Sequence, residues 1–305
     1  MTMGIDSVLV AFRSEKVIEE AIQALEPLAG RVVVVDHGDG RAAGRARDAG
    51  ALAIEDPTNP GFGTGQNRGV AATGSEFVLI CNPDALVVPG AVQEGVRQLE
   101  ARPDVAAVQG VIMNQVTGLP ERSQGVEVGP LHLLGRAVGA RRLLGLWPVR
   151  SVLARSTTLG DHVHRIPPAP VEVESLAATA VLVRRSAFEE VGGFDPSFFL
   201  YGEDLDLCHR LRLAGWKLLA VPEVWAHHLG GGSASSSWDR EVQWWRGTLR
   251  FGARWWGRTA WSMAMFAAVL RWLRTALSAL PESGPALAAM VVEPTVVRRQ
   301  LRAGL

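Results

Sequence analysis

The N-terminal stretch SVLVAFRSEKVIEEAIQALEPLAGRVVVVDHGDG, residues 7–40, decides the fold class. Residues 7–12 form a short apolar, β-branched run, which is typical of a buried strand. The segment after it has an apolar side at helical spacing, made of Val17, Ile18, Ala21, Ile22 and Leu25. Residues 31–40 are a second apolar strand that ends in an acid and a turn. The order strand, helix, strand predicts a parallel sheet with helices on both faces.

The segment EFVLICNPDA, residues 76–85, repeats the design of a buried strand followed by an acid. Asp36 and Asp84 therefore fall at the carboxyl ends of predicted strands, where ligands bind in such sheets. Asp84 is well placed to hold a divalent ion against phosphate oxygens, and Asp36 to contact a nucleobase or ribose. The alternatives are structural: a turn at Asp84, and an Asx-turn from Asp36 to Gly38.

Composition excludes several classes of protein. The chain has 305 residues, 48% of them hydrophobic, which is enough to bury a large core. Its formal net charge of +0 argues against a nucleic-acid partner, since phosphate binding needs a basic excess. Cys81 and Cys208 lie far apart, so neither a disulfide framework nor a zinc ribbon is indicated. Asp6 interrupts the apolar run that a signal peptide needs, so we expect a cytoplasmic protein.

The stretch FFLYGEDLDLCHRLRLAGW, residues 198–216, predicts a helix that begins after Gly202 and is capped by Gly215. Acids in the first turn are favoured by the helix dipole, and Asp206 has a partner at Arg210. That structural explanation does not account for Glu203 and Asp204, which directly follow an aromatic approach. Partial desolvation there would raise a carboxyl pKa toward that of a useful base, so we expect one of them to act in catalysis.

The rest of the chain divides at a glycine- and serine-rich hinge. Residues 118–170 show no confident period and are interpreted as an active-site or acceptor loop. The hinge at 230–237 suggests a catalytic domain over 1–233 and a helical, Trp- and Arg-rich extension over 234–305. His228, just before the hinge, is either an ordinary loop residue or an extra metal ligand beside Asp84.

The segment 243–261 has the pattern of an amphipathic helix. Its aromatic side is Trp244, Trp245, Leu249, Phe251, Trp255 and Trp256, and its basic side is Arg246, Arg250, Arg254 and Arg258. Such a helix suits the surface of an anionic membrane, which we expect residues 243–274 to contact. The alternative is that the aromatic side packs on the catalytic domain or on a second subunit of a homodimer. The apolar run 259–270 is shorter than the roughly 20 residues of a spanning helix, so we expect peripheral attachment to the inner face of the cell membrane.

Together these motifs resemble the family 2 glycosyltransferases of GT-A fold, particularly bacterial rhamnosyltransferases of cell-wall and polysaccharide assembly. The resemblance spans residues 7–233. It is carried by SVLVAFRS, VVVVDHGDG, NPGFGTGQNRGVAA, CNPDA, VLVRRSAFEEVGGFDPSFFLYGEDLDLCHRLRLAGW and HHLGGGS. It implies an α/β GT-A fold, a Rossmann-like, mostly parallel sheet flanked by helices, with a C-terminal amphipathic helical extension.

The resemblance also implies roles for particular residues in an inverting sugar transfer. Asp204 resembles the catalytic base, and Glu203 a neighbour that positions the acceptor or the base. Asp84 resembles the last acid of a DxD-type metal motif, and His228 the late histidine near the metal, which would be Mg²⁺ or Mn²⁺. The implied nucleotide-sugar contacts are Ala11, Arg13, Asp36, Asn67, Asn82, Asp84 and Thr179.

The implied donor is a dTDP-, UDP- or GDP-sugar, with dTDP-rhamnose first, and the acceptor is a glycan or a polyprenyl-diphosphate-linked sugar. The chain departs from the family pattern at Ala11, Phe12 and Arg13, in the short DHGDG turn, and at Ala178, where many relatives have glycine. These departures affect the donor contacts.

Two other functions compete with this interpretation. The glycines of GFGTGQNRG suggest a dinucleotide-dependent oxidoreductase, but they do not lie in the first strand-to-helix turn, where a pyrophosphate would bind. A binding protein that kept the fold and lost turnover is the second alternative, against which the retained Asp84 and Asp204 argue.

Overall fold

The computed structural model describes residues 5–139, 166–229, 237–276 and 288–303. Contacts within the chain group it into two compact units. The sheet unit comprises Met1–Val126, His164–Phe199 and Asp206–Ser233, and the helical unit comprises Glu127–Val163, Leu200–Leu205 and Ala234–Leu305. The boundary near residue 233 stays a prediction, and this grouping adds 127–163 and 200–205 to the C-terminal part.

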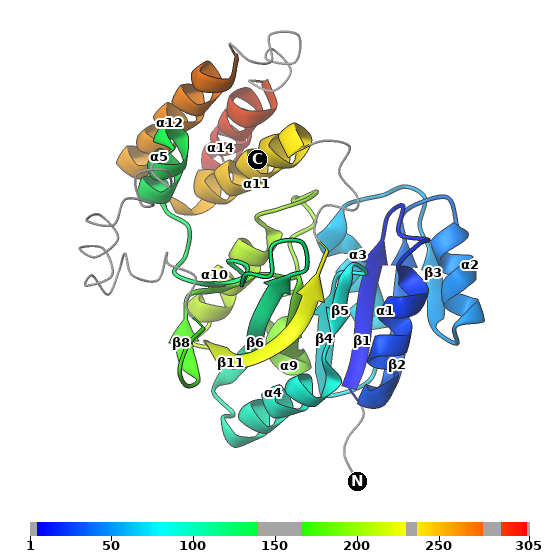
Figure 1. The fold of residues 1–305 in the computed structure, drawn as a ribbon. Helices are drawn as coiled ribbons and strands as arrows, with labels where there is room; N and C mark the ends of the chain where they lie inside the picture. Colours follow the sequence, from blue (N-terminus) through cyan, green and yellow to red (C-terminus); the bar gives the residue numbers. More distant parts are fainter. Residues whose placement is uncertain (1–4, 140–165, 230–236, 277–287, 304–305) are drawn as a thin grey trace. The chain divides into compact units, whose positions relative to one another are not determined.

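The sheet unit is built on a large, mostly parallel sheet (Figure 1). Its strands are β1 (Ile5–Ala11), β2 (Ala29–Asp36), β3 (Leu52–Glu55), β4 (Phe77–Cys81), β5 (Ala85–Val87), β6 (Val105–Asn114), β8 (Val171–Val173), β10 (Ala180–Arg184) and β11 (Lys217–His228). Their order is β3-β2-β1-β4-β10-β6-β11-β5, with β8 paired to β11. β10 runs antiparallel between β4 and β6, while β11 is parallel to β6. Two short strands, β7 (Gln124–Gly125) and β9 (Ser175–Leu176), pair separately.

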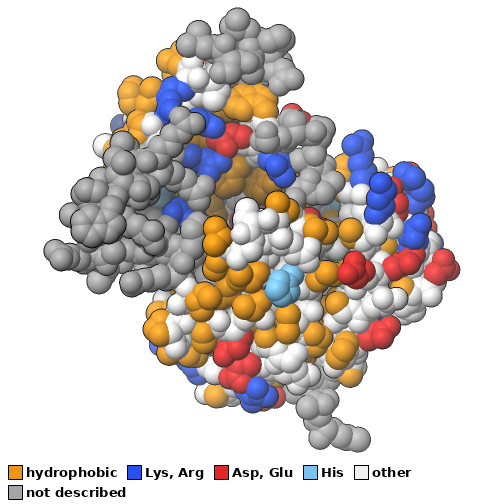
Figure 2. Space-filling view, viewed as in Figure 1, with side chains coloured by type: hydrophobic (Ala, Val, Ile, Leu, Met, Phe, Trp, Pro, Cys, Tyr) orange, Lys and Arg blue, Asp and Glu red, His pale blue; other side chains and the backbone are white. Residues whose placement is uncertain are grey.

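Helices cover both faces of this sheet (Figure 1). One face packs against α1 (Ile18–Leu25), α2 (Arg41–Asp48) and α4 (Pro89–Ala101), and the 3₁₀ turn η1 (Glu26–Leu28) follows α1. The other face packs against α3 (Phe62–Ala71), α9 (Arg185–Glu190) and α10 (Glu203–Leu213). Figure 2 shows acidic and basic side chains gathered over α1 and α2, where Arg45 pairs with Glu19 and Arg41 with Glu15. The predicted α/β architecture is confirmed.

The glycines of GFGTGQNRG let α3 lie close to the sheet. A Cβ at Gly69 would stand 2.1 Å from Cγ1 of Val8, and one at Gly65 would stand 2.8 Å from Cγ2 of Val10. Side chains at either position would push α3 off β1. Packing therefore explains this motif, which follows β3 and not the first strand as a dinucleotide fingerprint would.

The helical unit contains α5 (Pro130–Val138), α11 (Ser237–Trp255), α12 (Arg258–Ala276), a π-helical turn η3 (Ala288–Val292) and α14 (Glu293–Ala303). Its core contains Leu133, Ala137, Trp245, Leu249, Ala253, Trp261, Ala264, Ala267, Ala268 and Met290. The interpretation of 118–170 as an active-site or acceptor loop is therefore wrong for α5, which is a helix that packs against α12. Residues 140–165 of that segment lie outside the described residues.

The amphipathic helix predicted over 243–261 is present as α11, but it ends at Trp255 and its aromatic side is not free. Trp245, Leu249 and Phe251 are fully buried, and the first two belong to the core of the helical unit. The structure therefore corrects the expectation that these three side chains contact a membrane, because all three are removed from solvent within the protein.

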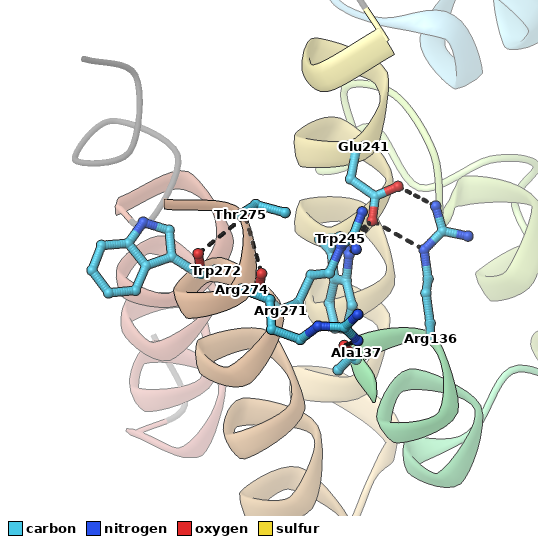
Figure 3. Close-up of polar contacts among 8 residues, drawn as sticks. All are labelled: Arg136, Ala137, Glu241, Trp245, Arg271, Trp272, Arg274 and Thr275. Atoms are coloured by element: carbon cyan, nitrogen blue, oxygen red, sulfur yellow. Dashed lines mark hydrogen bonds and ion pairs between the residues drawn. The ribbon is translucent and has the colours of Figure 1, made fainter. Parts of the chain in front are cut away.

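A charged cluster ties three helices of this unit together (Figure 3). Glu241 of α11 accepts hydrogen bonds from Arg136 of α5, from Arg271 of α12 at 3.0 Å and from the indole N–H of Trp245 at 2.9 Å. Burial alone would raise the pKa of Glu241, but these donors hold it below its usual value.

Candidate active site

Strand pairing brings Asp84 and His228 together in the sheet unit. β5 and β11 pair antiparallel with Ala85 opposite His228, so Asp84, which directly precedes β5, lies beside the end of β11. The backbone N–H of Leu229 donates to the carbonyl of Asp84 at 3.0 Å. Nε2 of His228 then lies 3.3 Å from Oδ1 of Asp84. The two predicted metal ligands are thus neighbours although far apart in sequence.

Glu121 fixes the orientation of the His228 ring. Its Oε2 lies 3.0 Å from Nδ1 of His228, and its Oε1 accepts a hydrogen bond of 2.8 Å from the amide of Asn114. Burial would lower the pKa of His228, but hydrogen bonds to Asp84 and Glu121 raise it to about 9. Sequence reasoning missed Glu121, because only the hairpin that pairs Met113 with Pro120 brings it back to the end of β6.

The donors at this edge suit a divalent cation. A carboxylate and an imidazole are ligands that Mn²⁺ and Mg²⁺ accept, and two protein ligands leave coordination positions for phosphate oxygens and water. Among the described residues, no group of three His, Cys, Asp or Glu side chains is placed to hold a metal. The arrangement therefore fits an ion shared with a diphosphate, with Asp84 and His228 as its protein ligands, better than a closed structural site.

Asn82 and Thr179 also meet at this edge of the sheet. The N–H of Asn82, just after β4, donates to the carbonyl of Thr179, just before β10, at 2.9 Å. The amide of Gln109 in β6 donates to the carbonyls of Ala177 at 2.6 Å and Ala180 at 2.9 Å. Gln109 therefore anchors the backbone on both sides of Thr179. Gln109 is fully buried and carries no sequence signal beyond being a polar residue inside an apolar strand.

Both carboxylate oxygens of Asp36 accept hydrogen bonds from backbone N–H groups. Its Oδ1 accepts the N–H of Gly38 at 2.8 Å, which is the predicted Asx-turn, and its Oδ2 accepts the N–H of Ala43 in α2 at 2.9 Å. The neighbouring positions are structural too: Ala11 is buried, and Arg13 adopts a φ of 56° with its guanidinium 5.1 Å from the Phe12 ring centroid. Contact of these residues with a nucleobase stays a prediction.

A buried polar group that sequence reasoning did not single out lies beyond β2 and β3. Nε2 of His37 is 3.7 Å from Oδ2 of Asp56, which also binds Arg68 of α3. Burial lowers the pKa of His37 despite the acid beside it. The only signal in the sequence is that Asp56 follows a short strand, as Asp36 does.

Asn67 has a structural task in the sheet unit. Its amide nitrogen donates to the carbonyl of Phe194 at 2.8 Å, and its amide oxygen accepts the N–H of Phe194 at 2.9 Å. This reciprocal pair holds the loop after α9 against α3. A contact of Asn67 with the donor stays a prediction.

Glu203 and Asp204 open α10 and belong to the helical unit, so they are described apart from Asp84 and His228. Burial, and then the charge of Asp204, raise the pKa of Glu203 well above its ordinary value. Oδ1 of Asp204 accepts the N–H of Leu205 at 2.8 Å. Asp206 pairs with Arg210 at 2.6 Å, as the structural explanation predicted. The two carboxyl groups are adjacent, so the titration of each depends on the charge of the other. The role of Asp204 as the base stays a prediction.

Comparison with known proteins identifies the family of this chain. Residues 10–255 match the model of the "Glycosyltransferase like family 2" family, and the chain belongs to that family. It is 31% identical over 224 residues to an N-acetylglucosaminyl-diphospho-decaprenol L-rhamnosyltransferase of Mycobacterium tuberculosis, covering 64% of this chain and 69% of the relative. It is 36% identical over 113 residues to the rhamnosyltransferase WbbL of Escherichia coli, covering 35% and 43% of the two chains.

Solved structures share the fold. A mannosyltransferase of Pyrobaculum calidifontis, PcManGT, in complex with GDP-Man and Mn²⁺, superposes with a TM-score of 0.54 at 15% identity, covering 98% of this chain and 87% of that one. Glucosyl-3-phosphoglycerate synthase of Mycobacterium tuberculosis, in complex with Mn²⁺ and UDP, gives 0.50 at 20% identity, with coverages of 81% and 78%. The protein is therefore a family 2 glycosyltransferase with the GT-A fold.

Proposed function

We propose that this glycosyltransferase moves L-rhamnose from dTDP-rhamnose, with inversion, to a sugar carried on a polyprenyl diphosphate. The observation that carries the proposal is the Asp84 and His228 pair, 3.3 Å apart at the edge of the sheet in a family 2 chain. The sugar and the acceptor follow from the 31% identical relative, whose name specifies an N-acetylglucosaminyl-diphospho-decaprenol acceptor.

The reaction needs a base and a stabilised leaving group. Asp204 takes the proton from an acceptor hydroxyl, whose oxygen forms a bond to the anomeric carbon as the bond from that carbon to the diphosphate oxygen breaks. Asp84 and His228 would hold Mg²⁺ or Mn²⁺, which supplies neutralisation of the charge on the departing nucleoside diphosphate. Glu121 keeps the imidazole turned toward Asp84.

A donor screen tests the donor and the metal together. The purified chain is heated with dTDP, UDP, GDP or NAD, each with and without Mn²⁺, and its Tm is recorded. We expect the largest rise with dTDP and Mn²⁺, because a ligand bound only by the folded state raises Tm. dTDP-rhamnose is then incubated with N-acetylglucosaminyl-diphospho-polyprenol, and the product mass is read. A rise in Tm with UDP or GDP alone would mean that the donor is a UDP- or GDP-sugar and not dTDP-rhamnose. A rise with NAD alone would contradict sugar transfer.

The same proposal includes contact with an anionic membrane, made by residues other than the buried aromatic side of α11. Phe266 and Leu273 lie two helical turns apart on α12 and are 63% and 52% exposed. Arg258 and Arg274, at the two ends of α12, are also exposed. Exposed apolar side chains flanked by cations are typical of a surface that lies in the headgroup region. Among the described residues, no helix combines the length and hydropathy that crossing a bilayer requires.

Vesicle sedimentation tests this surface. We expect the protein to pellet with vesicles that contain anionic lipid and to stay in the supernatant with zwitterionic ones. Phe266→Asp should reduce the fraction of protein that sediments with the vesicles, because it places a negative charge against the negatively charged lipid headgroups. Val116→Asp, at an exposed apolar site in the sheet unit, is the matched control. Equal binding of Phe266→Asp and the original protein would remove α12 from the contact.

A further inference from the structure

The segment that leads into the acid pair is seated directly on the backbone of α11. A Cβ added to Gly247 would stand 1.9 Å from the carbonyl oxygen of Tyr201 and 3.1 Å from that of Leu200. In the other direction, a Cβ on Gly202 would stand 2.5 Å from the carbonyl oxygen of Gly247. All of these residues belong to the helical unit.

The same segment has an unusual backbone. Tyr201 has a φ of 64° and Gly202 a φ of 85°, so consecutive residues are left-handed just before α10 begins at Glu203. A left-handed backbone is strained at a tyrosine and persists only where its surroundings hold it. The backbone of α11 at Gly247 is one part of those surroundings, because it lies directly against the carbonyl of Tyr201.

We propose that Gly247 is a positioning residue for the catalytic base: its missing side chain lets α11 hold Tyr201 and Gly202 in the conformation that directs Asp204. The C-terminal helix is then a support of the active site as well as a part of the extension. The inference rests on the proposed role of Asp204. No residue type other than glycine fits, because the obstructing atoms are backbone and have no alternative rotamer.

The substitution Gly247→Ala separates this role from helix stability. Alanine is a better helix former than glycine in a helix interior, so helix propensity by itself favours the change. Any loss must come from displacement of Tyr201. A displacement of about 1 Å at a reacting group costs roughly 100-fold in rate. We therefore expect kcat to fall at least tenfold, with the Kd for dTDP and Mn²⁺ unchanged.

Two further glycines supply matched controls. The nearest neighbours of a Cβ at Gly252, in the same helix, would be side-chain atoms of Trp256, the first at 2.2 Å, and a Cβ at Gly257 meets nothing within 4 Å. Gly252→Ala tests whether any steric strain in α11 lowers kcat, and Gly257→Ala tests the change in composition alone. We expect both to keep kcat within about twofold of the original.

A spectroscopic readout needs no substrate, because Tyr201 is the single tyrosine of the chain. Labelling with 3-fluorotyrosine gives one ¹⁹F resonance that reports on this segment. We expect Gly247→Ala to shift or broaden it and both controls to leave it in place. An unchanged resonance with kcat retained in Gly247→Ala overturns the inference, as does an equal fall in kcat for Gly252→Ala.

Asp204→Asn, measured in parallel, separates the two proposals. If Asp204→Asn keeps its turnover, the assignment of Asp204 as the base fails. If Asp204→Asn loses turnover while Gly247→Ala keeps it, only the positioning role of Gly247 fails.

Discussion

At the scale of single residues, the site depends on how one imidazole is held. His228 lies between two carboxylates, with Nδ1 toward Glu121 and Nε2 toward Asp84. A carboxylate on the far nitrogen fixes the tautomer and the ring orientation of a metal-binding histidine. In the proposed metal site, Glu121 would therefore determine whether Nε2 faces an ion held beside Asp84.

Glu121→Gln should weaken Mn²⁺ binding by about 10- to 100-fold, the usual effect of losing such an outer partner. The measurement is a titration of the nucleotide complex with Mn²⁺, followed by the EPR signal of the free ion. Glu172→Gln, which alters an exposed pair with Arg102 in the same unit, is the control. Equal Mn²⁺ affinity in both variants would mean that Glu121 does not orient the ring.

A second residue-scale prediction concerns Glu203 and pH. Its pKa in the folded chain is raised well above 4.5, so the folded state keeps a proton that the unfolded state releases. The contribution of Glu203 to the free energy of unfolding therefore falls as pH rises from about 4.5 through the folded pKa. Glu203→Gln removes this dependence, so the Tm of the variant minus that of the original should increase with pH over that window. A difference that stays constant with pH would contradict the assignment.

At the scale of elements, the helical unit shows how one carboxylate links helices that are distant in sequence. α5 contributes Arg136 and α12 contributes Arg271, and both guanidinium groups bind Glu241 of α11 (Figure 3). The side chain of Glu241 is only 13% exposed, so its charge depends on these donors for solvation. The cluster fixes the angular setting of the helices around their apolar core.

Glu241→Gln should lower the free energy of unfolding by about 1–3 kcal/mol, because it leaves two guanidinium groups without their counter-charge and both arginines are partly solvated. The difference in the free energy of unfolding between the original protein and the variant should be largest near neutral pH. It should shrink in acid, where the carboxyl of Glu241 is itself protonated. Because the pKa of Glu241 is lowered in the folded state, this decrease should occur below about pH 4.5. Chemical denaturation followed by tryptophan fluorescence measures it. Glu100→Gln, on the exposed side of α4, should change little, and an equal effect there would show that the cluster has no special role.

At the scale of the whole molecule, the residues proposed for donor and metal binding and the proposed base fall in different units. Asp36, Asn82, Asp84 and His228 belong to the sheet unit, whereas Asp204 belongs to the helical unit. The proposed roles rest on different side chains, so substitutions should separate binding from proton transfer.

Asp204→Asn should abolish sugar transfer, by at least 100-fold in kcat, while the Kd for dTDP and Mn²⁺ stays within about twofold. Asp84→Asn should raise the Kd for dTDP and Mn²⁺, because it removes a charged metal ligand and so weakens the nucleotide complex. Calorimetric titration with dTDP and Mn²⁺, alongside a product assay, measures both. Turnover retained by Asp204→Asn would remove the base from the mechanism.

Much of the fold could be predicted because strands and helices are local patterns. The apolar runs at β1, β2, β4 and β6 and the glycine that follows α10 mark elements that the structure contains. α5 was not predicted from its own sequence, and in the structure its apolar side packs in the core of the helical unit, against α12. The aromatic stripe of α11 was recognised, but its partner was not, since an apolar face carries no information about what will cover it.

The sequence by itself determined the order of the elements, the family and the acids that end the strands, because these depend on residue types at fixed spacings. Tertiary structure alone decided that Glu121 turns His228 toward Asp84, that Asn67 and Asp36 spend their polar atoms on backbone groups, and that Gly247 gives Tyr201 room. Each of these contacts joins segments through strand register, a hairpin or helix packing. Such contacts are set by distances across the fold, which the spacing of residues along the chain does not encode.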